Sequence, residues 1–181
     1  LAEKISLHRK DNAKILEEKI NEYLKFLYLN NAKIIINKKI LDSSGIDEVI
    51  FELNGVSLDT ISSGEYNRLR LALLTSMSEF DIVDNGILFL DEIDANLSGK
   101  ESEAIAKVLV KLSSSYQIFA ISHQTQLTSS ANQHFLVDKQ NGKSSVKLLN
   151  KEEKINEIAR MISGEKVTSE ALEFAKNLLN N

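Results

Sequence analysis

Cysteine and proline are absent from this chain of 181 residues, and glycine occurs only 7 times. Without cysteine the chain can form no disulfide and no cysteine-ligated zinc site, which suits a reducing compartment. No apolar run reaches the length of a membrane-spanning helix and no signal-peptide pattern is present, so we expect no membrane contact. A basic composition is also lacking, since the formal net charge is −4. Any contact with nucleic acid must therefore be local.

The chain also lacks the pattern Gly-x-x-x-x-Gly-Lys-[Ser/Thr], the loop whose backbone amides and lysine hold nucleotide phosphates. It begins at Leu1 instead of methionine, as we expect of a piece of a longer protein. What is present is 43% hydrophobic residues, which suffices for one sizeable core. The composition therefore predicts one domain or lobe.

Residues 3–29 are predicted to form an amphipathic helix, with Ile15, Ile20, Leu24 and Leu27 near one face. Such a helix either packs on the surface or ends a coiled coil, because its apolar spacing is too short to establish heptads.

Strands that alternate with helices between residues 86 and 137 indicate a partly parallel sheet covered by helices. Residues 86–94 and 117–122 read as buried strands of this sheet. The other predicted elements are a first hairpin (32–41 and 47–53), helices at 64–80, 99–113, 151–162 and 169–179, a short helix after His123, and a second hairpin that turns at Asn141-Gly142.

The stretch Ile-Leu-Phe-Leu-Asp-Glu ends an apolar strand in two carboxylates, Asp91 and Glu92. Open α/β sheets place ligands at the carboxyl ends of their strands. There Asp91 could hold a water of Mg²⁺, and Glu92 could orient or deprotonate the water that attacks a γ-phosphate. The alternative is a strand that simply ends in solvated acids.

The stretch Ile-Ser-His ends a second apolar strand at the same predicted sheet edge. A neutral His123 can donate one hydrogen bond and accept another, which suits contact with a phosphate oxygen. The alternative is a helix start, with Ser122 as the N-cap and His123 in the first turn.

The stretch Ile-Ser-Ser-Gly-Glu, 61–65, opens directly into the helix expected over 64–80. Ser62 and Glu65 fit a capping box, in which the serine side chain bonds the Glu65 amide and the glutamate bonds back. The same helix start favours an anion, and Gly64 permits close backbone approach. The stretch therefore predicts a cap, a phosphate contact, or both. Ser98 and Glu101 repeat the capping pattern before the helix at 99–113.

Taken in order, these stretches resemble the second half of an ABC-type ATPase head in the SMC-related group, and most closely the bacterial RecN family. "SSGEYNR" is similar to the RecN signature S-G-G-E-x-x-R, and "DEIDANLSG" to its Walker B and D-loop pattern D-E-x-D-x-x-[IL]-S-G. "SH" matches the switch histidine. The closing "EIARMISGEKVTSEALEFAKNLL" also resembles the end of RecN proteins. The resemblance extends from about residue 33 to the end of the chain.

The resemblance implies that residues 31–181 are the C-terminal lobe of the head, an α/β lobe with a partly parallel sheet, flanking helices and β-hairpins. Residues 1–30 would end a coiled-coil arm. ATP and Mg²⁺ would bind only together with an N-terminal lobe that carries Walker A. The implied process is ATP-driven dimerisation with a second head, acting on DNA in double-strand break repair and recombination in the bacterial cytoplasm, at the nucleoid.

The resemblance also implies a role for each site residue. Glu92 and His123 would be catalytic and Asp91 would serve the metal. The residues in contact with nucleotide would be Ser62, Ser63, Gly64 and Glu65, facing the nucleotide of the second copy, and Ser98 of the D-loop.

Two departures from the family pattern matter. Ser63 stands where RecN signatures have their first glycine, and a positive φ there would strain a serine. Walker A is absent, so the chain alone is expected to be inactive.

Two alternatives stay open on the residues alone: another SMC or RecF-like head, and a non-catalytic dimerisation module. The closing pattern argues against the first, and the Asp-Glu pair argues against the second. Candidate DNA contacts are Lys38, Lys39, Arg68 and Arg70, although scattered charges more often form a solvated face. Arg68 also matches the signature arginine, which suggests a link between the ATP site and helix packing.

Overall fold

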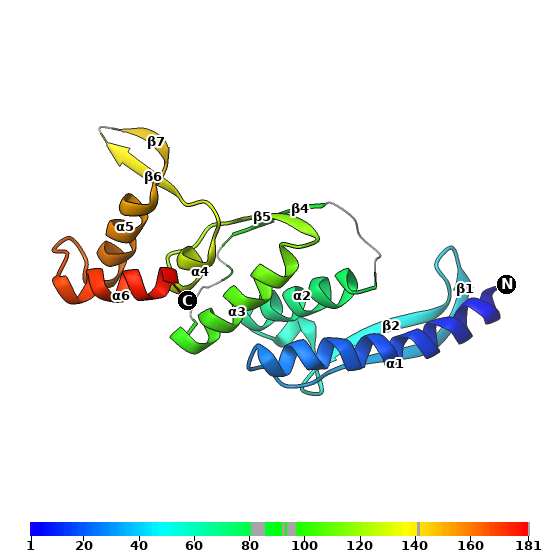
Figure 1. Ribbon diagram of the computed structural model, residues 1–181. Helices are drawn as coiled ribbons and strands as arrows, with labels where there is room; N and C mark the ends of the chain where they lie inside the picture. Colours follow the sequence, from blue (N-terminus) through cyan, green and yellow to red (C-terminus); the bar gives the residue numbers. More distant parts are fainter. Residues whose placement is uncertain (81–85, 92, 94–96, 141, 181) are drawn as a thin grey trace. The chain divides into compact units, whose positions relative to one another are not determined.

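The computed structural model describes residues 1–80, 86–91, 93, 97–140 and 142–180. The chain divides into two compact units, Leu1–Leu88 with Lys111–Ile118 and Phe89–Val110 with Phe119–Asn181. Figure 1 shows the order of the elements, which alternate between helices and short sheets as the α/β prediction requires. Among the described residues, no helix combines the length and the apolar character that crossing a membrane requires.

The first unit combines a long helix with an antiparallel sheet. Helix α1 (Ala2–Phe26) is followed by the hairpin β1 (Ala32–Asp42) and β2 (Gly45–Leu53), and β2 also pairs with β3 (Val56–Ser57). Figure 1 shows the hairpin running alongside α1. A 3₁₀ turn, η1 (Leu58–Thr60), then leads into α2 (Ser63–Ser78).

Helix α1 packs through the second half of its length. Ile20, Leu24 and Leu27 are fully buried, as predicted, whereas Ile15 is 50% exposed. Ile15 lies five residues before Ile20, which is about 140° away around a helix, so it cannot share the buried face.

Side chains of α1 also complete the outer edge of β1. The Asn21 amide exchanges hydrogen bonds with the backbone of Ala32, and Glu17 accepts one from the Ile34 amide at 2.7 Å. Backbone groups of an edge strand are otherwise open to pairing with other chains. Helix α1 therefore protects this part of the edge.

A buried carboxylate attaches the first half of α1 to the hairpin. The Asp47 side chain on β2 is 0% exposed and accepts hydrogen bonds from Ser6 Oγ at 2.6 Å and Arg9 at 3.1 Å. Arg9 also donates to the Ser44 carbonyl in the hairpin turn. These contacts hold the pKa of Asp47 below its usual value, chiefly through the Ser6 hydrogen bond.

Helix α2 ends earlier than predicted, at Ser78 instead of Phe80. Leu69 and Ala72 are buried, and Phe80 is exposed because it follows the helix. Leu71, Thr75 and Ser76 are buried instead. The hydroxyls of Thr75 and Ser76 each donate a hydrogen bond to the backbone carbonyl four residues earlier in α2. These bonds offset the free-energy cost of burying the two polar groups.

The second unit contains the motif-bearing strands and the closing helices. Strands β4 (Gly86–Leu90) and β5 (Tyr116–Ala120) form a two-stranded parallel sheet, with α3 (Gly99–Leu112) between them in sequence; β6 (Phe135–Gln140) and β7 (Lys143–Leu148) form an antiparallel hairpin. Both units contribute residues to β4, α3 and β5. The remaining elements are α4 (Thr125–Ser130), α5 (Lys151–Ser163) and α6 (Ser169–Asn180).

Helices α5 and α6 pack into a small core of their own, built on Ile158, Ala159, Ala171 and Ala175. Both closing helices start at the predicted residues, 151 and 169, and each ends one residue later than predicted. The second hairpin is confirmed, although Asn141 lies outside the described residues.

The prediction that the strands around residues 87–90 and 118–121 are buried is wrong for this chain. Phe89 is 74% exposed and Ile121 is 68% exposed, and the rings of Phe89 and Phe119 stack with centroids 5.0 Å apart. The cause is that a sheet of two strands leaves one face without a covering layer among the described residues, whereas the sequence pattern is typical of a sheet covered on both faces.

Candidate functional site

The start of α2 is a complete capping box. Ser62 is the N-cap; its Oγ accepts from the Glu65 amide at 3.2 Å and donates to Glu65 Oε2 at 2.7 Å. Glu65 Oε2 also accepts from the Ser62 amide at 2.9 Å. These bonds to Ser62 lower the pKa of Glu65. The Ser62 side chain is exposed, so the helix start is capped and open to solvent at the same time.

Ser63 carries no backbone strain. Ser63 and Gly64 are the first two residues of α2, and neither is among the described residues with positive φ, which outside glycine are Tyr28 and Asn54. The serine in the first glycine position therefore fits an ordinary helical turn.

Arg68 is buried, which excludes it as a contact for DNA. Its guanidinium donates to the Gly64 carbonyl at 3.4 Å and to the Leu27 carbonyl at 3.2 Å. One arginine thus connects the start of α2 with the end of α1, whereas its link to an ATP site stays a prediction. Lys39, another of the candidate contacts, pairs with Asp42 at 2.7 Å.

In the second unit, the ends of β4 and β5 lie side by side. The Ile121 amide donates to the Leu90 carbonyl at 2.9 Å, so Asp91 and Ser122 follow neighbouring strand ends at one sheet edge. Asp91 is exposed there, and so is His123. Glu92 lies outside the described residues.

Ser122 does not act as the N-cap of the following helix. Its Oγ accepts from the Gln124 amide at 2.9 Å, and α4 starts only at Thr125, with Gln124 as its N-cap. His123 therefore lies in a loop between strand and helix and not in a first helical turn.

Ser98 caps α3 as predicted. The Ser98 amide donates to Glu101 Oε2 at 2.9 Å, and the Glu101 amide donates to Ser98 Oγ at 3.4 Å. A side chain at Gly99 would come within 3.7 Å of the Gln126 amide nitrogen, which puts the start of α3 beside α4. The second unit thus gathers the predicted D-loop serine and the helix that follows His123.

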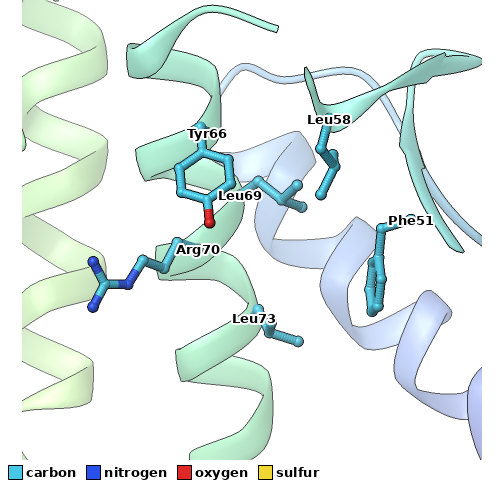
Figure 2. A pocket seen from close by; sticks show the side chains of 6 residues that line it. All are labelled: Phe51, Leu58, Tyr66, Leu69, Arg70 and Leu73. Carbon is cyan, nitrogen blue, oxygen red and sulfur yellow. The ribbon is translucent and has the colours of Figure 1, made fainter. Parts of the chain in front are cut away.

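A groove lies along α2, on the side of the helix shown in Figure 2. Its helix wall has the spacing i, i+3, i+4, i+7, and Phe51 and Leu58 stand opposite. None of the residues predicted to contact nucleotide lines it. The helix residues of the wall are Tyr66, Leu69, Arg70 and Leu73.

The sequence analysis missed a polar cluster in the first unit. The Tyr23 hydroxyl donates to Glu79 Oε1 at 2.5 Å, and Lys111 donates to both groups. Lys111 and Tyr23 hold the pKa of Glu79 at about 2, and Glu79 raises the pKa of Lys111 to about 12. Residues this far apart in sequence give no local signal, so only the folded chain reveals the cluster.

Metal ligands do not gather on the described part of the chain: there, no group of three or more His, Cys, Asp or Glu side chains could hold an ion. Asp91, at the edge of the sheet, is one exposed residue with a single carboxylate. This fits Mg²⁺, which keeps most of its waters and takes one or two carboxylates together with substrate phosphates.

A family model described as the RecF/RecN/SMC N terminal domain matches residues 3–146. The chain belongs to this family. It is similar to the DNA repair protein RecN of Helicobacter pylori strain J99, with 42% identity over 179 residues. That match covers 99% of the chain and 34% of the relative, so the chain spans about a third of the length of RecN.

Solved structures of the family share the fold. The SMC head domain with coiled coil and joint from Pyrococcus yayanosii gives a TM-score of 0.69 at 21% identity, covering 90% of this chain and 31% of that one. A structure from a study of ATP-driven dimerisation and DNA-stimulated activation of SMC ATPases gives 0.59 at 18% identity, covering 89% of this chain and 99% of that one.

Proposed function

We propose that the chain is the C-terminal lobe of the ATPase head of a RecN-like protein that works in DNA double-strand break repair and recombination in the bacterial cytoplasm, at the nucleoid. Residues 1–30 would end a coiled-coil arm and residues 31–181 would form the lobe. The observation that carries the proposal is the sheet edge at which Asp91 and Ser122–His123 follow neighbouring strand ends. In this proposal Asp91 belongs to Walker B and Ser122–His123 to the switch, and the match of residues 3–146 to the RecF/RecN/SMC family supports that assignment.

The exposed sheet face supports a lobe that needs a second half. Parallel sheets are covered on both faces in folded proteins, yet Phe89, Phe119 and Ile121 are exposed. The hairpin β6–β7 likewise exposes the opposed pairs Phe135–Leu148 and Val137–Val146. A Walker A lobe of the same protein would cover apolar surface and supply the phosphate loop. The fold likeness to a solved chain that is covered over 99% of its own length supports a lobe of about this extent.

Each site residue has a role in this proposal. Ser62 to Glu65 would face the nucleotide of a second head, where the open start of α2 and its dipole favour a γ-phosphate. Asp91 would hold a water of Mg²⁺, Glu92 would take the proton of the attacking water, and His123 would bond a γ-phosphate oxygen. Ser98 would contact nucleotide from the start of α3. The Mg²⁺ would neutralise charge on the phosphates.

In this scheme ATP bound between two heads closes the dimer, and hydrolysis reopens it. The serine hydroxyl that donates to Glu65 in the lobe would turn to the phosphate oxygen of the partner's nucleotide. DNA would be bound by the intact protein, which in this proposal adds a second lobe and the rest of the arm to this chain.

The test is ATP turnover by the intact protein, or by this chain combined with the Walker A part of the same protein. Glu92→Gln keeps the shape and removes the base, so turnover should fall by ~10²–10⁴-fold while ATP binding persists. Glu103→Gln is the matched control, because Glu103 pairs only on the surface of α3 with Lys107. Turnover close to wild type in Glu92→Gln would contradict the proposal and make Glu92 a solvated strand end.

A further inference from the structure

The three-stranded sheet of the first unit is protected at one edge and open at the other. On the β1 side, α1 bonds the backbone of Ala32 and Ile34. On the β2 side, β3 pairs only with Glu52 and Leu53, and among the described residues no strand lies beside the rest of β2. Natural sheets usually protect such edges, because open backbone groups pair with other chains. The unprotected edge of β2 is therefore a place where a further strand can bind.

The register determines which backbone groups of β2 face this open edge. In an antiparallel pair, two residues opposite each other either exchange hydrogen bonds or both point outward. Ala32 and Ile34 point outward from β1, because α1 bonds their amides. Phe51 lies opposite Ile34 and so points outward from β2, and Val49 follows two residues before it in the same alternation. The N–H and C=O groups of Val49 and Phe51 are thus oriented toward a strand that the described chain does not supply.

The groove along α2 includes Phe51, the residue of this edge that lies next to the pairing with β3. Figure 2 shows Leu69 and Leu73 of α2 pointing toward Phe51, so this part of the groove is apolar. Its volume of about 120 Å³ is below the roughly 300–1,000 Å³ of small-molecule sites and suits one large apolar side chain. Sheets bind extended peptides in this way, because the strand edge supplies hydrogen bonds and pockets receive alternate side chains.

Arg70 indicates the charge of the occupant. Among the described residues that line the groove, Arg70 is the charged one; it is exposed, and no described residue forms an ion pair or hydrogen bond with it. A guanidinium binds a carboxylate well, often through two parallel hydrogen bonds. The groove therefore fits a segment that carries an acidic side chain together with an apolar one. These two side chains would be two positions apart, because residues i and i+2 of a strand share a face.

We propose that the open edge of β2 and the groove along α2 dock an extended segment of a partner protein. The segment adds a strand beside Val49 and Phe51, places an apolar side chain in the groove and sets a carboxylate against Arg70. The Walker A lobe of the proposed function would cover apolar sheet faces of the second unit, which do not include this groove. The docking site is independent of ATP turnover.

Selection of peptides from a random displayed library by this chain, without nucleotide, tests the proposal. The selected peptides should share a large apolar residue with Asp or Glu two positions away, and Arg70→Glu should exchange that preference for Lys or Arg. Val49→Pro removes one outward amide and keeps the β1–β2 ladder, so it should weaken binding of a selected peptide by about fivefold. Ile36→Pro is the matched control, because Ile36 is the register partner of Val49 at the opposite edge, and it should bind as wild type does.

Peptides without an acid preference, or equal binding by Val49→Pro and Ile36→Pro, would overturn the proposal. A dimer of the chain in sedimentation that Val49→Pro dissociates would also overturn it, since a second copy would then occupy the edge. Binding of the peptide by this chain but not by the intact protein would assign the groove to the protein's own remaining part. Arg70→Glu changes only an exposed side chain, so it tests the site even where a proline variant fails to fold.

Discussion

Ser62 has two uses that the same geometry serves. Its hydroxyl accepts from the Glu65 amide and donates to the Glu65 carboxylate, which closes the helix start of the lobe. A phosphate at this helix start would compete with Glu65 for the same hydroxyl and the same dipole. Helix α5 begins with a capping box of the same kind, in which the N-cap is the uncharged Asn150 and its partner is Glu153.

Replacing Ser62 should separate the cap from the phosphate contact. Ser62→Ala should lower the free energy of unfolding by about 1 kcal/mol, whereas Ser62→Asn should keep it, because asparagine caps equally well. In the intact protein, both variants should lose ATP-dependent head dimerisation, since the small hydroxyl donor is gone. Urea unfolding of the chain and sedimentation of the intact protein with ATP are the measurements.

The reciprocal change, Asn150→Ser, is the control, because it swaps the same two caps at a helix outside the site. Normal ATP-dependent dimerisation of Ser62→Asn would reduce Ser62 to a helix cap.

At the scale of elements, the first half of α1 is attached to the rest of the first unit more by hydrogen bonds of polar side chains than by buried apolar surface. Ser6 and Arg9 donate to Asp47, Glu17 and Asn21 bond the backbone of β1, and Tyr23 donates to Glu79 at the end of α2. The apolar contacts begin only at Ile20. The polar contacts determine where the helix lies along the hairpin.

Asp47→Ala should destabilise the chain by about 1–3 kcal/mol, because it leaves the buried Ser6 hydroxyl without its acceptor. Asp42→Ala removes an exposed carboxylate of the same hairpin, and it should lower the free energy of unfolding by less than Asp47→Ala does, because water screens an exposed ion pair. Urea unfolding of both variants gives the comparison. Equal losses of unfolding free energy in the two variants would mean that burial does not make the Asp47 contacts more stabilising.

The cluster of Tyr23, Glu79 and Lys111 should add stability only over a definite pH range. The folded-state pKa of Glu79 is about 2, below the ordinary value of 4.5, so its contribution is present above 4.5 and is lost as the pH falls toward about 2. The difference in unfolding free energy between wild type and Glu79→Gln should therefore be largest at neutral pH and shrink across that window. A difference that stays constant down to about pH 2 would show that the ionised Glu79 carboxylate adds no stability.

At the scale of the whole molecule, the chain carries more exposed apolar side chains on its short sheets than a self-sufficient fold would place there. The stacked pair Phe89 and Phe119 and the cross-strand pair Val137 and Val146 are the clearest cases. Contiguous exposed apolar surface marks a site of association. This agrees with a chain that spans about a third of RecN.

The chain by itself should neither bind ATP tightly nor hydrolyse it, because it has no Gly-x-x-x-x-Gly-Lys loop to hold the phosphates. Isothermal titration calorimetry of the isolated chain with ATP and Mg²⁺ should show no binding at micromolar nucleotide. A dissociation constant in the micromolar range would contradict the need for a second lobe.

The sequence by itself determined the features that depend on neighbours in the chain. The helix starts at Ser62 and Ser98 were readable because a capping box closes over three residues. Both hairpins were readable from β-rich runs around short turns, and Gly45, with φ of +104°, begins β2 directly after the turn of the first. The order of the motifs, and with it the RecF/RecN/SMC family, is likewise a property of the linear sequence.

Only the tertiary structure decided which side chains meet across long separations and which apolar residues are covered. Ser6 and Asp47 are 41 positions apart, and Tyr23 and Lys111 are 88 apart, so no periodicity links them. Phe89 and Ile121 have the pattern of buried strands, yet burial depends on a covering layer that hydropathy along one segment does not encode. A hydrogen bond between near neighbours can be predicted from the residues around it. The burial of a side chain depends on all the elements that pack around it in the folded chain.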